Sequence, residues 1–382
     1  MANITKRGDT YRIKVSCGYD IHGKQVVKST TYKPDPSKSD RWNEKELQRQ
    51  AVLFEEQCKH GQAVTSAKFE AYAEEWFKVY AEVTLKRNTI SNYHSFKKRV
   101  YVALGHIRLD KITPLDIQRL ISTLMTAGLG VDTIKQHVRF VSVILNHAIK
   151  KRILTYNPCI AVDYPLAQEK QRSFYTVEEV RALLEALRND GEKSTPFTMF
   201  FTLAAYTGLR KGELLGLEWK DLDFDNQTLT VARAYYYDAH RRENFTDTPK
   251  TRKSRRTLKL PSHIMDTLEV YKGWQDEQRE LFGASWIDSD RVFTSRNGTP
   301  MNTAAPAYFL KCFTQRTGMR TLTIHSFRHF NASVLINGGV DVVTVQSALG
   351  HSTPATTLSI YSHAFDNAQT RAMEAIANVI DL

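Results

Sequence analysis

The sequence predicts a multidomain α+β protein. It comprises a small N-terminal β-sheet backed by one helix, a helical domain, and a mixed, mainly helical C-terminal domain with a small β-sheet. Three observations lead to this fold class. The 382 residues suffice for two or three domains, and the 42% hydrophobic content is ordinary for a globular protein. Strand-like alternation near the N-terminus gives way to apolar stripes with helical spacing. A stretch with two prolines and no clear periodicity then separates these stripes from the remainder.

Residues 10–32 alternate with the period of β-strands. Two runs, TYRIKVSCG and KQVVKSTTY, flank a turn near Gly23. Alternate side chains of the first run face opposite ways, with Ile13, Val15 and Cys17 on one side and Arg12, Lys14 and Ser16 on the other. After Ser39 we expect a helix that ends near Gly61, with an apolar face made of Leu47, Ala51, Phe54 and Cys58. Residues 1–62 should therefore form a small domain whose polar sheet face is open.

Residues 66–152 have helical character. Two apolar stripes recur at helical spacing and should form a core: Phe69, Tyr72, Ala73, Trp76, Phe77 and Tyr80 in the first, and Ile134, Val138, Val141, Leu145 and Ala148 in the second. Two further helices are expected between them, in KRNTISNYHSFKKRV and TPLDIQRLISTLM, and the first of these is strongly basic. We place a helical domain at residues 63–165, which ends within the proline-containing stretch that we interpret as a linker.

A third domain is expected at residues 172–382. Thr176 and Glu179 have the spacing of a capping box in front of VRALLEAL, which predicts the start of a helix. Two strands, LTVARAYYY and SRRTLKLP, bracket a long loop. The last residues, AFDNAQTRAMEAIANVIDL, should form a tail helix with one apolar face.

Charge and composition narrow the class of protein. The net charge is +12, and the first 170 residues carry eleven of these twelve excess positive charges, a clustering typical of proteins that bind a nucleic-acid backbone. No apolar run approaches the ~18 residues of a membrane helix, and the N-terminus has no apolar stretch of the signal-peptide kind. The four cysteines form no Cys-x-x-Cys pair, which argues against a zinc ribbon or a disulfide framework. We therefore expect a cytoplasmic protein.

Three segments of the C-terminal domain carry residues suited to phosphate chemistry. TGLRKGEL contains Arg210, IHSFRHF contains His325 and Arg328, and LGHSTPATTLSIYSH contains His351 and Tyr361. Two guanidiniums can hold a phosphate by forked hydrogen bonds, and two imidazoles can donate to its oxygens or move a proton. A tyrosine with a base and positive charge nearby can act as a nucleophile, although its ordinary pKa is about 10. The set predicts a phosphate-holding site with a tyrosine nucleophile.

In residue type, order and flanking sequence, these segments resemble the tyrosine recombinases, also called the phage integrase family. The resemblance covers the last two thirds of the chain well and the first sixty residues more loosely. It implies an arm-type DNA-binding domain at 1–62, a core-binding domain at 63–165 and a catalytic domain at 172–382. It also implies a site-specific DNA recombinase that cleaves and rejoins DNA through a 3′-phosphotyrosine intermediate. Such an enzyme integrates or excises a mobile element, either a phage or an integrative conjugative element.

The resemblance further implies a lysine that donates a proton to the departing 5′-oxygen. TPKTRKSRRTL is similar to the hairpin that carries this lysine in the family. We assign the role to Lys250 and keep Lys253 as the main alternative. The neighbouring arginines are expected at most to touch phosphate: Arg252, Arg255 and Arg256.

Two spacings around the arginines bear on the chemistry. Glu213 follows Arg210 by three residues, so it shares a helical face with Arg210 and could orient its guanidinium. His325 and His329 have the spacing of a helical zinc pair, but the sequence offers no evident third ligand. We expect neither a metal nor another cofactor, because the resemblance implies that the tyrosine linkage conserves the phosphodiester energy.

Partners and rival functions follow from the same resemblance. It implies double-stranded DNA with core and arm-type attachment sites, a homotetramer on that DNA, and an excisionase and a DNA-bending protein as accessory partners. A type IB topoisomerase-like strand transferase would share the nucleophile and the arginines. A chromosomal dimer resolvase is a closer relative, disfavoured by the extra N-terminal domain. A metal-dependent transposase or nuclease would need clustered carboxylates.

Overall fold

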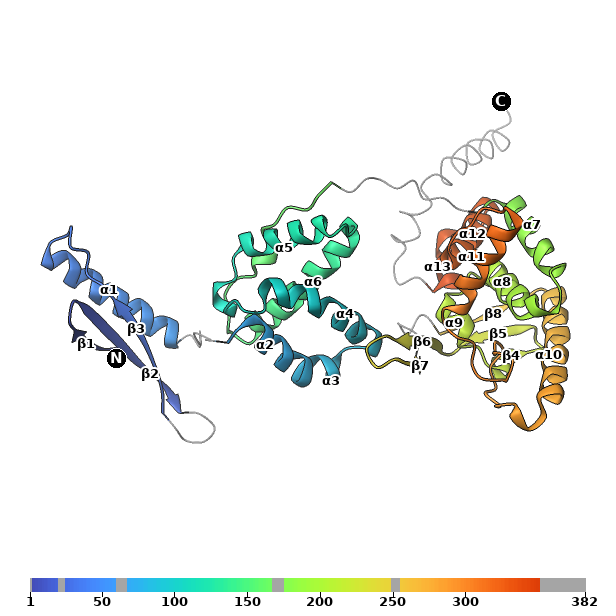
Figure 1. Ribbon diagram of the computed structural model, residues 1–382, viewed down its shortest axis with the longest axis horizontal. Helices are drawn as coiled ribbons and strands as arrows, with labels where there is room; N and C mark the ends of the chain where they lie inside the picture. The colour runs from blue at the N-terminus through green and yellow to red at the C-terminus, as the bar shows by residue number, and fades with distance from the viewer. Residues whose placement is uncertain (1, 20–24, 60–66, 167–174, 249–254, 351–382) are drawn as a thin grey trace, which may run out of the picture. The chain divides into compact units, whose positions relative to one another are not determined.

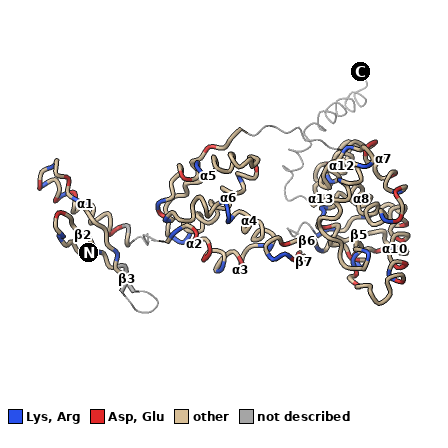
Figure 2. The backbone as a smooth tube through the Cα atoms, viewed as in Figure 1, with Lys and Arg blue, Asp and Glu red and all other residues tan. Residues whose placement is uncertain are grey.

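The computed structural model describes residues 2–19, 25–59, 67–166, 175–248 and 255–350 (Figure 1). The chain divides into two compact units, Met1–Glu169 and Lys170–Leu382. Both signs of charge are spread over each unit, with the excess of Lys and Arg in the first (Figure 2). Within the described ranges, no helix has both the length and the apolar character that crossing a membrane requires.

The first unit begins with a three-stranded antiparallel sheet. Its strands are β1 (Asn3–Arg7), β2 (Thr10–Tyr19) and β3 (Gln25–Tyr32), in that spatial order, and the helix α1 (Asp40–Lys59) packs against them (Figure 1). The predicted apolar faces meet in one core, made of Ile13, Val15, Leu47, Ala51, Phe54 and Cys58. The sequence did not predict β1, because its five residues contain only one apolar side chain, Ile4.

The rest of the first unit is helical. Its elements are α2 (Phe69–Trp76), the π-helical turn η1 (Phe77–Ala81), α3 (Glu82–Thr84), α4 (Arg87–Leu104), η2 (Leu109–Lys111), α5 (Pro114–Thr126), α6 (Val131–Lys150) and η3 (Pro158–Ile160). Both predicted stripes contribute to a single core, with Tyr72 and Tyr80 at its edge. The basic helix α4 directs one lysine inward. The amino group of Lys97 lies 4.0 Å from the centroid of the Phe77 ring and 2.9 Å from Glu74 Oε1.

The second unit contains most of the helices and two small sheets. Its helices are α7 (Val177–Arg188), η4 (Glu192–Ser194), α8 (Thr195–Thr207), α9 (Lys211–Leu215), η5 (Trp219–Asp221), α10 (Ser262–Phe282), η7 (Gly283–Ser285), α11 (Ala305–Thr317), α12 (Ile324–Asn337) and α13 (Val342–Leu349). The strands β4 (Leu222–Asp223), β5 (Thr228–Val231) and β8 (Arg256–Lys259) form one antiparallel sheet, and β6 (Ala234–Asp238) and β7 (Glu243–Asp247) form a hairpin.

Helix α8 is the centre of this unit. It is apolar on nearly all sides, which is typical of a fully buried helix, and it contacts α7, α10, α11 and α12 (Figure 1). The capping box predicted for α7 is present, since Thr176 N donates to Glu179 Oε2 at 2.8 Å and Glu179 N donates to Thr176 Oγ1 at 3.2 Å. The turn after α8 thus extends from a helix that is buried among α7, α10, α11 and α12.

The predicted strand LTVARAYYY is two strands in two different sheets. It breaks at Arg233, whose guanidinium lies 3.0 Å from Glu218 Oε2 and also bonds to Asp221. The predicted long loop also contains a strand, β7, whose Phe245 is buried against Tyr236. These local contacts override the strand pattern, which continues without interruption in the sequence. The predicted tail helix lies outside the described residues.

Candidate active site

Arg210 lies at the turn that joins α8 to α9. Gly208 ends α8 in the left-handed conformation, with φ of 59°, and Arg210 directly precedes α9. Arg210 Nη1 donates to Glu213 Oε1 at 2.7 Å, and Arg210 N donates to Glu213 Oε2 at 3.1 Å. The contact that the three-residue spacing predicted is therefore present, and Glu213 orients the Arg210 guanidinium.

Glu213 binds a second arginine, Arg256, at the start of β8. Arg256 Nη2 lies 3.1 Å from Glu213 Oε2, and the two side chains are 7% and 3% exposed. Burial alone would raise the pKa of the Glu213 carboxyl, but the charges of Arg256 and Arg210 and the hydrogen bonds from Arg210 together lower it below its ordinary value. Glu213 is thus an ionised, buried anchor for both guanidiniums.

Arg328 is buried in α12 and reaches two other elements. Its Nη1 donates to Gly208 O at 2.9 Å, and its Nη2 donates to Leu349 O at 2.6 Å. A Cβ on Gly208 would lie 2.5 Å from Leu349 Cδ2 and 2.9 Å from Asn331 Oδ1, so this approach requires glycine. The end of α8, the middle of α12 and the end of α13 therefore meet closely.

His325 lies three residues before Arg328 in α12, with its side chain partly exposed. Partial burial of the ring, together with the positive charges of Arg328 and Arg210, lowers the pKa of His325 from its ordinary value of 6.5. The imidazole is therefore mainly neutral near neutral pH. The ring centroid of His329 lies 4.7 Å away, but across the described ranges no three His, Cys, Asp or Glu side chains are grouped to hold a metal ion.

Three successive carbonyl groups at the end of α13 accept hydrogen bonds from three arginines. The pairs are Arg256 Nε to Ala348 O at 2.6 Å, Arg328 Nη2 to Leu349 O at 2.6 Å, and Arg210 Nη2 to Gly350 O at 3.1 Å. Such terminal carbonyls have no partner within their helix and carry the negative end of its dipole. The structure thus gathers positive charge at the helix end that immediately precedes His351 in the sequence.

Of the six predicted site residues, three belong to the described part of the chain, and the structure brings Arg210, His325 and Arg328 together. Lys250, His351 and Tyr361 lie outside the described residues. Sequence reasoning gave Arg256 at most a contact with phosphate, and the structure instead pairs it with Glu213 and Ala348. No local pattern singled out Arg256 from the neighbouring arginines.

Asn331 is a second residue that the sequence did not single out. Its Nδ2 donates to Ala205 O and Tyr206 O, both at 2.9 Å, and so holds the last turn of α8. The sequence does offer one indication of this role, because Asn331 follows Arg328 by three residues and so shares the buried face of α12.

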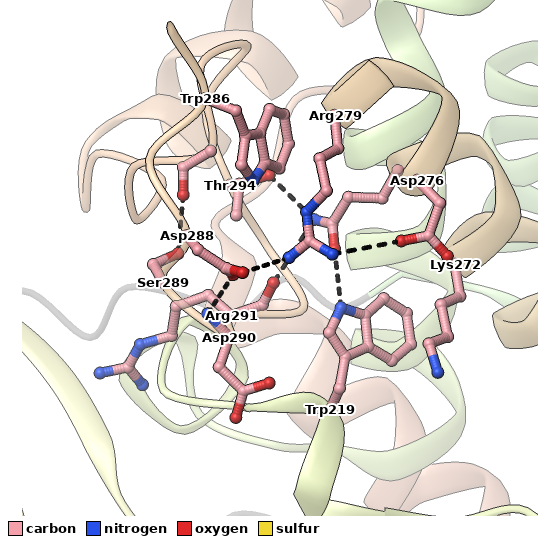
Figure 3. A pocket seen from close by; sticks show the side chains of 12 residues that line it. Trp219, Lys272, Asp276, Arg279, Trp286, Asp288, Ser289, Asp290, Arg291 and Thr294 are labelled. Atoms are coloured by element: carbon pink, nitrogen blue, oxygen red, sulfur yellow. Dashed lines mark hydrogen bonds and ion pairs between the residues drawn. The ribbon is translucent and has the colours of Figure 1, made fainter. Parts of the chain in front are cut away.

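A small cavity of the same unit borders α10 (Figure 3). Its volume of about 160 Å³ is below the roughly 300 Å³ of a typical small-molecule site. Arg279 bonds to Asp288 at 2.5 Å at its edge, and Trp219 Nε1 donates to Gln275 Oε1 at 2.7 Å (Figure 3). The cavity is therefore small for an organic ligand.

Comparison with known proteins identifies similar chains. Residues 173–368 match the model of the phage integrase family, and residues 68–125 match that of the phage integrase N-terminal SAM-like domain. A tyrosine recombinase XerC-like protein of Caldanaerobacter subterraneus subsp. tengcongensis is 27% identical, and the match covers 98% of this chain and 97% of that protein. The ICEBs1 integrase of Bacillus subtilis is 28% identical, with 76% of this chain and 78% of that protein covered.

Solved structures show the same fold. The Tn1549 transposon integrase in complex with a circular intermediate DNA is similar, with a TM-score of 0.68 and 20% identity over 82% of this chain and 100% of that chain. A lambda integrase tetramer bound to a Holliday junction gives a TM-score of 0.55 and 18% identity over 94% of each chain. The mainly helical α+β fold class predicted from the sequence is confirmed by these likenesses.

Proposed function

Because the chain belongs to the phage integrase family and is a tyrosine site-specific recombinase that breaks and rejoins DNA, we propose that Arg210 and Arg328 hold the scissile phosphate and that Tyr361 attacks it. The observation that carries this proposal is the convergence of both guanidiniums at the end of α13, directly before His351. A guanidinium stays protonated at any relevant pH and matches the geometry of phosphate oxygens. The arrangement therefore suits the charge that develops on the phosphate during attack.

The two arginines differ in how they would meet the phosphate. Arg210 is 36% exposed, and its guanidinium is paired with the buried Glu213. Part of this guanidinium is therefore accessible to a ligand. Arg328 is buried and directs two N–H groups at carbonyls, which fixes the plane of its guanidinium. Held donors need not reorganise when charge develops, and this lowers the barrier.

The reaction joins the Tyr361 oxygen to phosphorus while the bond from phosphorus to the 5′-oxygen breaks. This gives a 3′-phosphotyrosine and a free 5′-hydroxyl. A neutral imidazole at His325 or His351 would take the phenolic proton, and Lys250, or alternatively Lys253, would give a proton to the departing 5′-oxygen. A second 5′-hydroxyl then attacks the phosphotyrosine and rejoins the strand. The lowered pKa of His325 supports its role as a proton acceptor near neutral pH.

The partners of this reaction are proposed to be double-stranded DNA and further copies of the chain. The excess of positive charge in the first 170 residues supports contact with DNA along residues 1–62, for arm-type sites, and 63–165, for core sites. The similarity to a lambda integrase tetramer on a Holliday junction supports a homotetramer. We place the reaction in the cytoplasm, with an excisionase and a DNA-bending protein as accessory partners.

A nicked suicide substrate tests the proposal directly. The wild-type protein should form a covalent DNA adduct at Tyr361, in EDTA and without a nucleotide. Tyr361→Phe should form none and still bind the DNA, because it lacks only the nucleophilic oxygen. Peptide mapping that placed the DNA on another residue would contradict the assignment. Relaxation of supercoiled DNA that lacks any specific site would favour a topoisomerase-like strand transferase.

A further inference from the structure

Arg256 joins three elements that are far apart in the sequence. It is the first residue of β8, where it pairs with Val231 of β5. Its Nε donates to Ala348 O at the end of α13, and its Nη2 pairs with Glu213 of α9. The side chain is 7% exposed, so these contacts are made in the interior of the second unit.

We propose that Arg256 is a positioning residue of the recombination reaction, which holds the last turn of α13 and so fixes the point from which the chain continues to His351 and Tyr361. This inference rests on the function proposed above, because it concerns how the nucleophile reaches the phosphate. It gives Arg256 a task that differs from the phosphate binding proposed for Arg210 and Arg328.

Burial and charge argue against Arg256 as a phosphate contact. Its exposed fraction is 7%, compared with 36% for Arg210, which shares its carboxylate partner. Arg328 is also buried, but its contacts described above are with neutral carbonyl groups, which do not offset its charge. Its Nε and Nη2 groups are already directed at a carbonyl and a carboxylate. The pairing with Glu213 also offsets its positive charge locally, which weakens its attraction for an anion outside. Little of this guanidinium is left to face DNA.

The contact with α13 supports the positioning role. Ala348 O is one of the terminal carbonyls that a helix cannot satisfy internally, and a cation at that end also favours the helix dipole. Arg210 and Arg328 hold the next two carbonyls, so three arginines fix three consecutive residues. We propose that Arg210 and Arg328 also contact the phosphate, whereas Arg256 does not. Its removal therefore tests positioning separately from charge stabilisation.

Two modified substrates separate the possible roles. A methylphosphonate at the scissile position replaces a charged oxygen by a methyl group, so an arginine that neutralises charge is needed less. A sulfur in place of the bridging 5′-oxygen gives a leaving group that hardly needs a proton. A residue that acts by positioning the nucleophile should be required equally for both substrates and for ordinary DNA.

The experiment measures single-turnover cleavage of all three substrates by the full chain. Arg256→Ala should slow cleavage about 10²-fold, the loss that a misplacement of roughly 1 Å can cause, with DNA binding unchanged. The slowing should be the same on all three substrates, whereas Arg210→Ala should recover on the methylphosphonate. Arg256→Lys should regain part of the rate, because a lysine can reach one of the two partners. Lys259→Ala, which removes an exposed charge from the same strand, should cleave like wild type.

Hydrogen exchange gives a readout that does not depend on chemistry. Amides in the last turn of α13 should exchange faster in Arg256→Ala than in wild type, and Lys259→Ala should leave them unchanged. If Arg256→Ala does not fold, the same comparisons apply to Arg256→Lys. Recovery of the variant on the methylphosphonate, or cleavage at the wild-type rate, would overturn the positioning role. Absence of any adduct with the wild-type protein would instead overturn the proposed function itself.

Discussion

Two carboxylates of the second unit, the buried Glu213 and the partly buried Glu218, each bind more than one cation, but only the first lies at the candidate active site. Glu213 is held between Arg210 and Arg256. Both guanidiniums also donate hydrogen bonds to carbonyl groups at the end of α13. The first network therefore ends at the part of the chain that precedes His351.

Within the described residues, the second network does not reach the end of α13. Glu218 Oε2 lies 3.0 Å from Arg233 Nη1, and Glu218 Oε1 lies 3.5 Å from Arg291 Nη1. Arg291 also donates to Gly216 O at 2.5 Å and to Thr246 Oγ1 at 2.7 Å, which joins the end of α9 to the hairpin β6–β7. The side chain of Arg291 is 8% exposed, so it presents little surface to a partner.

The same residue types thus serve two purposes. In the first network one guanidinium, that of Arg210, is 36% exposed and can meet a ligand while Glu213 holds it. In the second network, Arg291 Nη1 and Nη2 both donate hydrogen bonds to acceptors within the fold. Lys220 also pairs with Glu218 at 2.7 Å and is 65% exposed, so an accessible cation alone does not mark a site. The first network differs because its accessible guanidinium also reaches the end of α13. Variants that break each network in turn test this distinction.

Glu213→Ala should have the largest effect. It leaves Arg210 and Arg256 without their carboxylate, and breaking a buried pair typically costs about 3–5 kcal/mol of unfolding free energy. Cleavage should fall by about 10²-fold or more, because Arg210 loses its orientation. Urea unfolding and single-turnover cleavage measure the two effects. Stability and cleavage close to wild type would show that Glu213 is not the anchor.

Glu213→Gln provides the matched control and a test of pH dependence. The folded-state pKa of Glu213 is lowered, so its ionised form stabilises the fold above its unfolded pKa of about 4.5 and loses this contribution as the pH falls through the folded value. The stability difference between wild type and Glu213→Gln should therefore be largest near neutral pH and shrink in acid. A difference that grew on acidification would contradict the lowered pKa.

Arg291→Met should separate stability from chemistry. It removes one cationic partner of Glu218, which keeps Arg233, together with the donors to Gly216 O and Thr246 Oγ1. We expect a loss of about 1–3 kcal/mol in unfolding free energy, the usual cost of an unpaired buried acceptor. Cleavage by the folded protein should change much less than in Glu213→Ala, because Arg291 makes no contact with the end of α13. Equal losses of cleavage in both variants would remove the distinction between the networks.

The elements that the sequence predicted well depend on local spacing. The apolar faces of residues 10–32 and 40–59 and the capping box of α7 involve residues at most a few positions apart, and the structure contains them. The break at Arg233 was not predictable in this way. It depends on Glu218 and Asp221, which lie on a preceding turn and interrupt a pattern that reads as one strand.

The candidate site was harder to predict from local spacing than the helices and strands were. Motifs pointed to Arg210, His325 and Arg328, and the structure places them together, while their chemical roles stay a proposal. Arg256 could not be singled out, because its partners Glu213 and Ala348 lie 43 residues before it and 92 residues after it. No periodicity encodes such contacts, which arise only when β8, α9 and α13 have packed.

Gly208→Ala should have an intermediate effect at the end of the first network. Gly208 has φ of 59°, and an added Cβ would lie 2.5 Å from Leu349 Cδ2. Gly191→Ala is a matched control, since Gly191 has φ of 87° but nothing within 4 Å of its Cβ position. Each substitution should lower the unfolding free energy by about 1–3 kcal/mol because of the backbone conformation. Gly208→Ala should lower it further, because the new Cβ meets Leu349, and should also slow cleavage. Equal unfolding midpoints for the two variants would show that Leu349 can move aside without loss of stability.

Arg279→Ala should have the smallest effect, although its ion pair is short. Arg279 Nη2 lies 2.5 Å from Asp288 Oδ2 at the edge of the small cavity, but the two side chains are 49% and 67% exposed (Figure 3). Solvent screens such a pair, so we expect a change of about 0.2–1 kcal/mol in unfolding free energy and none in cleavage. The comparison is Gln275→Ala in the same cavity. Gln275 is buried and bonds to Trp219 and Thr294, so its loss should cost about 1–3 kcal/mol. A larger loss in Arg279→Ala than in Gln275→Ala would mean that charge, rather than burial, sets the worth of a polar contact in this unit.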